Sequence, residues 1–191
     1  MCGIFGLYQR DGALIQTEVI KRATQALAHR GPDGIGYYID SESKLGLGHC
    51  RLSIFDTSPA ASQPMHYQDR LVITYNGEIY NFLELRDELK DLGHSFQNDS
   101  DTEVVLAAYA QWGTECQNRF NGMWALSIWD KKKQELFLSR DRFGIKPLYL
   151  LEYANTLAFA SEMKGFLHLL DFTPQIDETY ALMALEEPLS V

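Results

Sequence analysis

The sequence has few of the features that mark secreted, membrane-spanning or nucleic-acid-binding proteins. Only three cysteines occur in 191 residues, Cys2, Cys50 and Cys116, and none lies in a CxxC motif, which argues against a disulfide framework and a zinc ribbon. No apolar run approaches the roughly 20 residues of a membrane span, and no secretory leader opens the chain. Seventeen basic residues face 26 acidic ones, whereas a nucleic-acid surface needs a basic patch. We therefore expect a cytoplasmic protein that binds neither membranes nor nucleic acid.

Signatures of nucleotide and metal binding are missing as well. The chain has no GxxxxGK[ST] and no GxGxxG phosphate-binding loop. His66, His94 and His168 are scattered and do not show metal-ligand spacing. We therefore expect no metal and no cofactor in this chain. What the sequence does have is 46% hydrophobic and 23% charged residues, the proportions of a globular domain that folds around its own core.

The spacing of apolar residues predicts an α+β domain. Helical spacing occurs over 17–28, 82–92, 100–112 and 177–187. Strand-like runs cover 2–8, 35–39, 45–52, 71–75, 123–130, 135–139, 147–153 and 156–160. We expect Thr17 and Asn81 to be the N-caps of the first two helices, and a Ser100–Glu103 capping box to open the third. Because antiparallel strands have helices grouped between them, we predict two stacked sheets between helical layers.

Cys2 is the first candidate for a catalytic residue, because it directly follows the initiator methionine. Removal of Met1 would leave Cys2 with a free α-amine, whose pKa of about 7.7–8.0 keeps much of it unprotonated near neutral pH. One residue would then supply both a thiol nucleophile and a general base. Position alone favours the alternative, a small buried residue in a first strand.

Thiolate attack on an amide also needs donors for the developing oxyanion and groups that hold the substrate. Asn76 and Gly77 follow an apolar strand and offer a side-chain amide and a backbone N–H, although an ordinary Asn-Gly turn explains them too. Arg51 shares a strand face with His49. It offers a two-pronged hydrogen bond to a carboxylate, or it is a surface arginine. Asp101 offers a partner for an ammonium group, or it caps a helix.

Six segments together carry a resemblance that none carries alone. In chain order they are Cys2, 29–34 (HRGPDG), 48–55 (GHCRLSIF), 76–81 (NGEIYN), 100–103 (SDTE) and 140–149 (RDRFGIKPLY). Over 1–175 the chain resembles the N-terminal glutaminase domain of the asparagine synthetases, which are class II glutamine amidotransferases. The resemblance implies a four-layer αββα sandwich of the N-terminal-nucleophile hydrolase type, with 176–191 beginning a linker.

The resemblance also implies a reaction. The cysteine attacks the side-chain amide of L-glutamine, ammonia leaves, and water hydrolyses the γ-glutamyl thioester to glutamate. The residues that match the family's site are the nucleophile Cys2 and the oxyanion donors Asn76 and Gly77, Arg51 for the α-carboxylate with Leu52, Ser53, Ile54 and Phe55 beside it, and Glu78 and Asp101 for the α-ammonium. Cys50 is assigned no role.

The expected partner is an ATP- and Mg-dependent synthetase domain, whose SGGxDS nucleotide loop does not occur in this chain. We expect 140–147 to lie at the interface with that domain, which would choose aspartate or another acid as the ammonia acceptor. A homodimer is left open. Two alternatives to a glutaminase also stay open: a module that binds glutamine without turnover, and an N-terminal-cysteine amidase for penicillin or bile-salt amides. Arg51 with two acids disfavours the amidase, because its substrates carry no α-ammonium.

Overall fold

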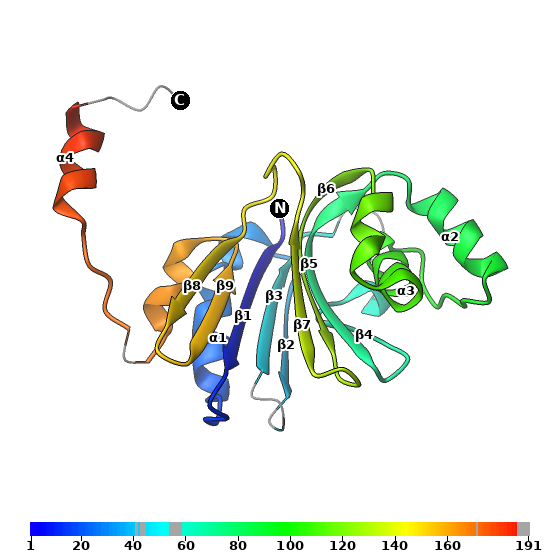
Figure 1. Ribbon diagram of the computed structural model, residues 1–191, viewed down its shortest axis with the longest axis horizontal. Coiled ribbons are helices and arrows are strands. Elements are labelled where there is room, and N and C mark those ends of the chain that lie inside the picture. The colour runs from blue at the N-terminus through cyan, green and yellow to red at the C-terminus, as the bar shows by residue number, and fades with distance from the viewer. Residues whose placement is uncertain (41, 43–44, 54–58, 171, 187–191) are drawn as a thin grey trace.

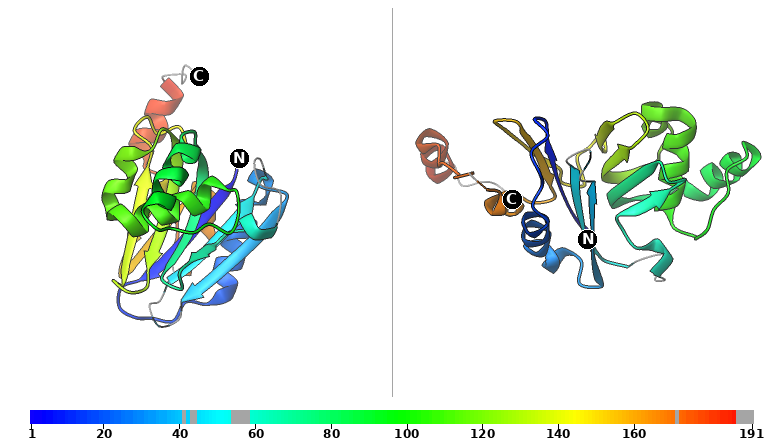
Figure 2. Two further views of the ribbon diagram at one scale, coloured as in Figure 1. Left: turned by 90° about the vertical axis from the view of Figure 1, so that its right-hand side faces the viewer. Right: turned by 90° about the horizontal axis from the view of Figure 1, so that it is seen from below.

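Two antiparallel sheets lie face to face, with helices on the outer face of each, in the computed structural model, which describes residues 1–40, 42, 45–53, 59–170 and 172–186 (Figure 1). One sheet has the strand order β2-β3-β1-β9-β8, and the other has the order β4-β5-β6-β7. Viewed from below, the two sheets and the two helical layers appear as four successive layers (Figure 2). The predicted α+β fold with an αββα sandwich is therefore confirmed.

The elements follow the predicted pattern closely. The strands are β1 (Gly3–Gln9), β2 (Gly34–Asp40), β3 (Leu45–Arg51), β4 (Met65–Tyr67), β5 (Leu71–Ile79), β6 (Gly122–Asp130), β7 (Glu135–Arg140), β8 (Tyr149–Tyr153) and β9 (Thr156–Ala160). The α-helices are α1 (Thr17–Gln25), α2 (Phe82–Asp91), α3 (Asp101–Trp112) and α4 (Glu178–Glu186). Short 3₁₀ helices are η1 (Ala28–Arg30), η2 (Pro59–Ala61), η3 (Gly113–Arg119) and η4 (Met163–His168). None of the helices in the described ranges is long and apolar enough to span a membrane.

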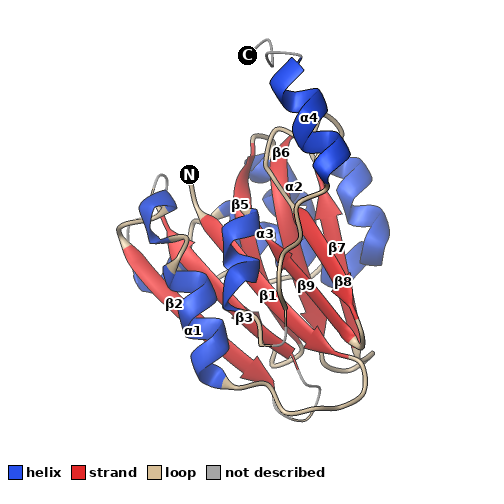
Figure 3. Cartoon of the chain, turned by 90° about the vertical axis from the view of Figure 1, so that its left-hand side faces the viewer, coloured by secondary structure: helices blue, strands red, loops and turns tan. Residues whose placement is uncertain are grey.

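Three apolar clusters hold the four layers together. Phe5 and Ile20 belong to the cluster between the five-stranded sheet and α1, which crosses the outer face of that sheet (Figure 3). Trp129 and Phe159 pack between the two sheets, while Ile128 packs with α2 and α3 on the other face of β6. The strand β6 is thus covered on both sides, and the alternation of side chains along a strand explains how neighbouring residues enter different clusters.

One predicted N-cap position is wrong, and another is right without a capping hydrogen bond from the side chain. The N-cap of α1 is Gln16, not Thr17, and no side chain caps that helix. Asn81 does sit at the N-cap of α2, but its side chain makes no cap. It instead donates to the Arg119 carbonyl (3.0 Å) and accepts from the Asn121 N–H (2.9 Å). A polar side chain at a helix start can bond to the first turn of its own helix or to another chain segment. Asn81 bonds to the other segment.

The predicted capping box at α3 is half formed. The Ser100 hydroxyl accepts from the Glu103 N–H (3.4 Å), as a capping residue should. The Glu103 carboxylate, however, accepts from the N–H groups of Gln97 and Asn98 (3.0 Å each) and not from Ser100. Glu103 therefore fixes the loop that leads into α3, and Ser100 alone caps the helix.

Candidate active site

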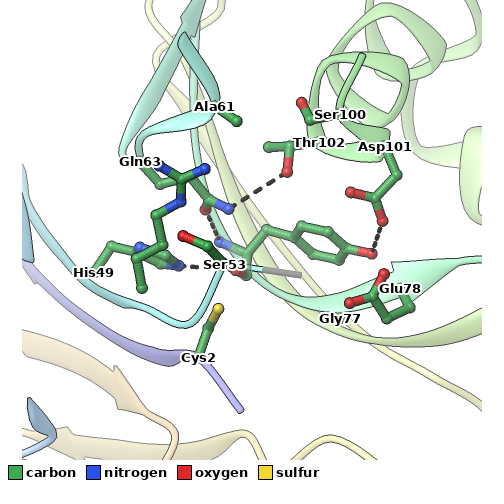
Figure 4. Close-up of a pocket in the computed structure, with 12 residues that line it drawn as sticks. Cys2, His49, Ser53, Ala61, Gln63, Gly77, Glu78, Ser100, Asp101 and Thr102 are labelled. Carbon is green, nitrogen blue, oxygen red and sulfur yellow. Dashed lines mark hydrogen bonds between the residues drawn. The ribbon is translucent and has the colours of Figure 1, made fainter. Parts of the chain in front are cut away.

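A small cavity of about 50 Å³ opens where the two sheets meet near the N-terminus. Its lining comes from Cys2 just before β1, from β3, from β5, from the start of α3 and from the segment around η2 (Figure 4). The lining residues are Cys2, His49, Arg51, Ser53, Ala61, Gln63, Tyr75, Gly77, Glu78, Ser100, Asp101 and Thr102. Six of the residues predicted from the sequence, from four separate motifs, therefore meet in one cavity.

Cys2 precedes β1 and points its sulfur into this cavity (Figure 4). The pairing of Gly3 with Cys50 places Cys2 beside the end of β3. There its Sγ accepts from the Leu52 N–H (3.3 Å) and lies 3.6 Å from the Leu52 carbonyl. Burial raises the pKa of the Cys2 thiol, whereas the Leu52 N–H and the N-terminal ammonium act in the opposite direction. Leu52, a predicted pocket residue, thus contributes through its backbone.

Arg30 holds the backbone of Cys2. Its Nε donates to the Cys2 carbonyl (3.0 Å). Arg30 reaches this position because η1 lies directly against β3, and Gly31 allows that approach. A Cβ on Gly31 would collide with the backbone of Cys50 and Arg51. The HRGPDG segment therefore has a physical role beside the nucleophile, although the sequence alone assigned none to Arg30.

Asn76 and Gly77 lie inside β5 and not in a turn after it. Asn76 is on the same face of β5 as Val72, which packs between the sheets. Its Nδ2 is buried without a hydrogen-bond partner among the described residues, and Asn76 is not among the residues that line the cavity. Gly77 lines the cavity, and a Cβ there would collide with the Tyr75 ring and the Met123 carbonyl.

Two carboxyl groups face the cavity from neighbouring elements. Asp101 Oδ2 accepts from the Tyr75 hydroxyl (2.8 Å) and the Ile79 N–H (3.0 Å). Burial raises the pKa of Asp101 above its usual value, although these two hydrogen bonds oppose the rise. Burial and then the nearby Asp101 charge raise the pKa of Glu78 to about 7, against the pull of Lys146. The Oε2 atom of Glu78 is buried with no partner in the described part of the chain. The pair is suited to accept a cation.

Arg51 and Ser53 also line the cavity. The Ser53 N–H donates to Asp33 Oδ2 (2.8 Å), which ties the segment after β3 to the HRGPDG loop. His49 also lines the cavity, on the same strand face as Arg51, as predicted. Its Nε2 lies 3.2 Å from the Tyr75 carbonyl and must therefore carry the proton. Burial lowers the pKa of His49 to about 4, so the ring is neutral at physiological pH. The predicted pocket residues Ile54 and Phe55 lie outside the described residues.

Gln63 is a lining residue that sequence reasoning missed. Its Oε1 accepts from the Tyr75 N–H (2.7 Å), and its Nε2 lies 3.4 Å from the Thr102 hydroxyl. These contacts join β5 to the start of α3 across the cavity. Gln63 lies in a stretch without helix or strand periodicity, so no local pattern indicates its position.

Within the described residues, no group of three or more His, Cys, Asp or Glu side chains could hold a metal ion.

Comparison with known proteins supplies the family. The glutamine amidotransferase domain family matches residues 1–188. The chain belongs to the glutamine amidotransferase family. Asparagine synthetase [glutamine-hydrolyzing] 1 of Bacillus subtilis is 44% identical over 172 residues, which cover 87% of this chain and 27% of that protein. Asparagine synthetase [glutamine-hydrolyzing] 3 of the same organism is 38% identical over 183 residues, with 94% and 29% covered. The resemblance predicted from the sequence is confirmed, and the chain spans less than a third of these relatives.

Solved structures confirm the fold. The glutamine phosphoribosylpyrophosphate amidotransferase from Bacillus subtilis, complexed with ADP and GMP, superimposes with a TM-score of 0.71 at 22% identity, covering 86% of this chain and 43% of that one. The structure of the allosteric regulatory enzyme of purine biosynthesis gives a TM-score of 0.72 at 21% identity, covering 87% of this chain and 43% of that one. The present chain therefore has the N-terminal-nucleophile hydrolase fold. The domain boundary at residue 175 stays a prediction.

Proposed function

We propose that this amidotransferase domain hydrolyses the side-chain amide of L-glutamine to glutamate and ammonia through a thioester on Cys2. One observation carries the proposal. The same cavity is lined by a partly exposed thiol (Cys2), an arginine (Arg51) and two acids (Glu78 and Asp101). Free glutamine presents the complementary set: an amide carbonyl, an α-carboxylate and an α-ammonium group.

Both charged groups on the α-carbon of the substrate have a partner of opposite charge in this proposal. The Arg51 guanidinium binds the α-carboxylate with two hydrogen bonds, the geometry that arginine favours. The Glu78 and Asp101 carboxylates bind the α-ammonium, whose positive charge offsets the burial and the Asp101 charge that raise the pKa of Glu78. With the α-carbon end held, the side-chain amide is directed toward Cys2.

The chemical step uses the nucleophile and two donors. After removal of Met1, the α-amine of Cys2 takes the thiol proton, and the sulfur attacks the amide carbon. The unpartnered Asn76 Nδ2 and the Gly77 N–H stabilise the oxyanion. The amide nitrogen accepts a proton and leaves as ammonia, and water then cleaves the thioester, releasing glutamate and restoring the thiol. We propose that neither metal nor cofactor takes part, so that hydrolysis persists in EDTA.

We propose further that the ammonia passes to an ATP- and Mg-dependent synthetase domain outside this chain. The segment 140–147 is suited to contact such a partner. Asp141 accepts from the N–H groups of Phe143 (3.1 Å), Ile145 (3.0 Å) and Lys146 (3.0 Å) and so fixes the loop. Phe143 is nevertheless 89% exposed and Ile145 56% exposed.

All three cysteines are free thiols, which fits the proposal that the protein works in the reducing cytoplasm.

The test measures ammonia and glutamate release from glutamine by protein whose loss of Met1 is verified by intact mass. We expect hydrolysis by the wild-type chain, none by Cys2→Ala, and wild-type rates in Cys50→Ala as the matched control. One adduct on Cys2 from 6-diazo-5-oxo-norleucine, a glutamine-analogue electrophile, is the second expected result. Glutamine binding without hydrolysis or adduct would overturn the proposal in favour of a module that only binds glutamine. Equal cleavage of an uncharged acyl amide would favour the wider amidase.

A further inference from the structure

A cluster of four charged or ionisable side chains lies just outside the candidate active site, where β9 ends against η1. The Glu162 carboxylate is its centre. Its Oε1 accepts from Arg30 Nη1 (2.8 Å) and His29 Nε2 (2.9 Å), and its Oε2 accepts from Lys164 Nζ (3.1 Å). None of these four side chains lines the cavity that holds Cys2. The cluster is therefore unexplained by binding of glutamine.

Arg30 connects this cluster to the nucleophile. Two of its nitrogens have different partners: Nη1 donates to Glu162, and Nε donates to the Cys2 carbonyl (2.8 and 3.0 Å). The Arg30 side chain is 10% exposed and the Glu162 side chain is 28% exposed, so these contacts are partly buried. A continuous path of hydrogen bonds thus runs from Glu162 to the backbone of Cys2.

Cys2 needs such support because of its place in the sheet. The pairing of β1 with β3 begins at Gly3, one residue later. The next residue, Ile4, is held on both sides by Ser161, whose N–H donates to the Ile4 carbonyl (2.9 Å) and whose hydroxyl accepts from the Ile4 N–H (3.0 Å). The Arg30 hydrogen bond fixes the peptide plane between Cys2 and Gly3 in the same way. The orientation of this plane sets the direction of the Cys2 side chain.

We propose that Glu162 is a positioning residue for the amidotransferase reaction: it holds the Arg30 guanidinium against the Cys2 carbonyl and so directs the sulfur at the substrate amide. The inference rests on the proposed function, since it takes Cys2 as the nucleophile. Glu162 itself touches neither substrate nor sulfur. Its charge is present throughout the working pH range, because hydrogen bonds from Arg30, Lys164 and His29 outweigh burial and bring its pKa to about 2.

Positioning and simple electrostatics predict opposite results for Glu162→Gln. Loss of a negative charge leaves more net positive charge near the thiol, which lowers a thiol pKa and favours the reactive thiolate. A purely electrostatic role therefore predicts an unchanged or faster reaction. Positioning predicts a slower one, because misplacement of a reacting group by about 1 Å can cost on the order of 100-fold in rate.

The test compares wild type, Glu162→Gln and two matched variants. Lys164→Met removes a hydrogen bond from the same carboxylate but leaves Arg30 in place, and Glu152→Gln removes an exposed acid that pairs with Arg10 (3.4 Å) at the edge of the same sheet. For Glu162→Gln we expect kcat to fall about tenfold or more with KM for glutamine within about twofold, since the glutamine-binding groups are elsewhere. Lys164→Met should lose less than about threefold, and Glu152→Gln should match wild type.

Two further readouts separate positioning from a general structural effect. The maximal rate of Cys2 modification by 6-diazo-5-oxo-norleucine should fall with kcat in Glu162→Gln, while the pH midpoint of Cys2 alkylation by iodoacetamide should stay unchanged or move down. Unchanged kcat, or a fall explained by an upward move of that midpoint, would overturn the proposal. If Glu162→Gln does not fold, Glu162→Asp keeps the charge but shortens the reach to Arg30, and its kcat should fall with an unchanged midpoint.

The outcome also distinguishes this inference from the proposed function. A wild-type chain that has lost Met1 and yet takes no adduct from the glutamine analogue would refute Cys2 as a glutamine-directed nucleophile. A wild-type chain that reacts at the same maximal rate as Glu162→Gln would refute only the role of Glu162.

Discussion

Glutamine affinity should fall as the pH drops through about 7, because Glu78, the proposed partner of the substrate ammonium, takes up a proton there. Burial and the neighbouring Asp101 raise the pKa of Glu78 to about 7 in the unliganded amidotransferase domain. An ammonium group binds the carboxylate and not the carboxylic acid. The proton must therefore leave before glutamine binds, so affinity is highest above pH 7 and declines below it.

The size of the effect follows from that pKa. With a midpoint at pH 7, Glu78 is about 90% charged at pH 8 and about 10% charged at pH 6. If only the charged form binds the ammonium, the dissociation constant for glutamine rises about tenfold over those two pH units, or about 1.4 kcal/mol. The substrate ammonium stays protonated throughout, so it adds no pH dependence of its own.

Calorimetry on Cys2→Ala provides the assay, because this variant binds glutamine without consuming it. Titrations at pH 6, 7 and 8 in two buffers of different ionisation enthalpy give both the affinity and the number of protons released. We expect close to one proton to be released per glutamine bound at pH 6, and almost none at pH 8. In Glu78→Gln/Cys2→Ala the pH dependence should disappear, while the exposed control Glu84→Gln/Cys2→Ala should keep it. A tenfold change that survives Glu78→Gln would refute the assignment.

Three other perturbations test the architecture of the site. Asp141→Asn should lower the free energy of unfolding in urea by about 2 kcal/mol, because the carboxylate accepts from four backbone N–H groups, including Trp124 (3.3 Å). Since these bonds lower the pKa of Asp141 against the effect of burial, its contribution in the wild type should disappear only as the pH falls below about 3.8. Gly31→Ala should destabilise the fold by at least about 1–3 kcal/mol in the same assay, because its Cβ has no room against β3; an unchanged midpoint would contradict this packing. Iodoacetamide at pH 8 should modify Cys2 alone, as seen by peptide mass, because Cys2 is partly exposed. Cys50 and Cys116 are buried, and burial raises their pKa values to about 11 and about 12.

The sequence predicted the elements of the fold where the pattern depends on local physics. Alternating or continuous apolar runs gave the strands, and the hairpin of β6 and β7 turned at the expected polar residues. The errors lie where a side chain had a choice of partners. Asn81 could cap α2 or tie it to distant backbone, and only the position of Arg119 and Asn121 decides between them. The sequence contains no local signal for that position.

The site residues also divide into those that the sequence indicates locally and those that depend on distant partners. Cys2 was found from its place directly after Met1, Arg51 from its position on a strand, and Glu78 through the family resemblance. The cavity brings the three together. Gln63 and Glu162 were missed because their partners are far away in the chain. Gln63 meets Thr102 across 39 positions, and Glu162 meets Arg30 across 132. Such residues become visible only when the sheet pairing is known.

Asp101 illustrates how the structure resolves an ambiguity that the sequence could only state. Helix capping and ammonium binding compete for one carboxylate, so the motif SDTE allowed either role. In the structure Ser100 caps the helix, and Asp101 is the first helical residue. The helix N-terminus, which favours an acid at this position, therefore does not use the Asp101 side chain as its cap. Hydrogen bonds from Tyr75 and Ile79 instead hold that carboxylate at the cavity wall beside Glu78. Because the capping task falls to its neighbour, Asp101 can keep a carboxylate in a buried place where a substrate cation would stabilise it.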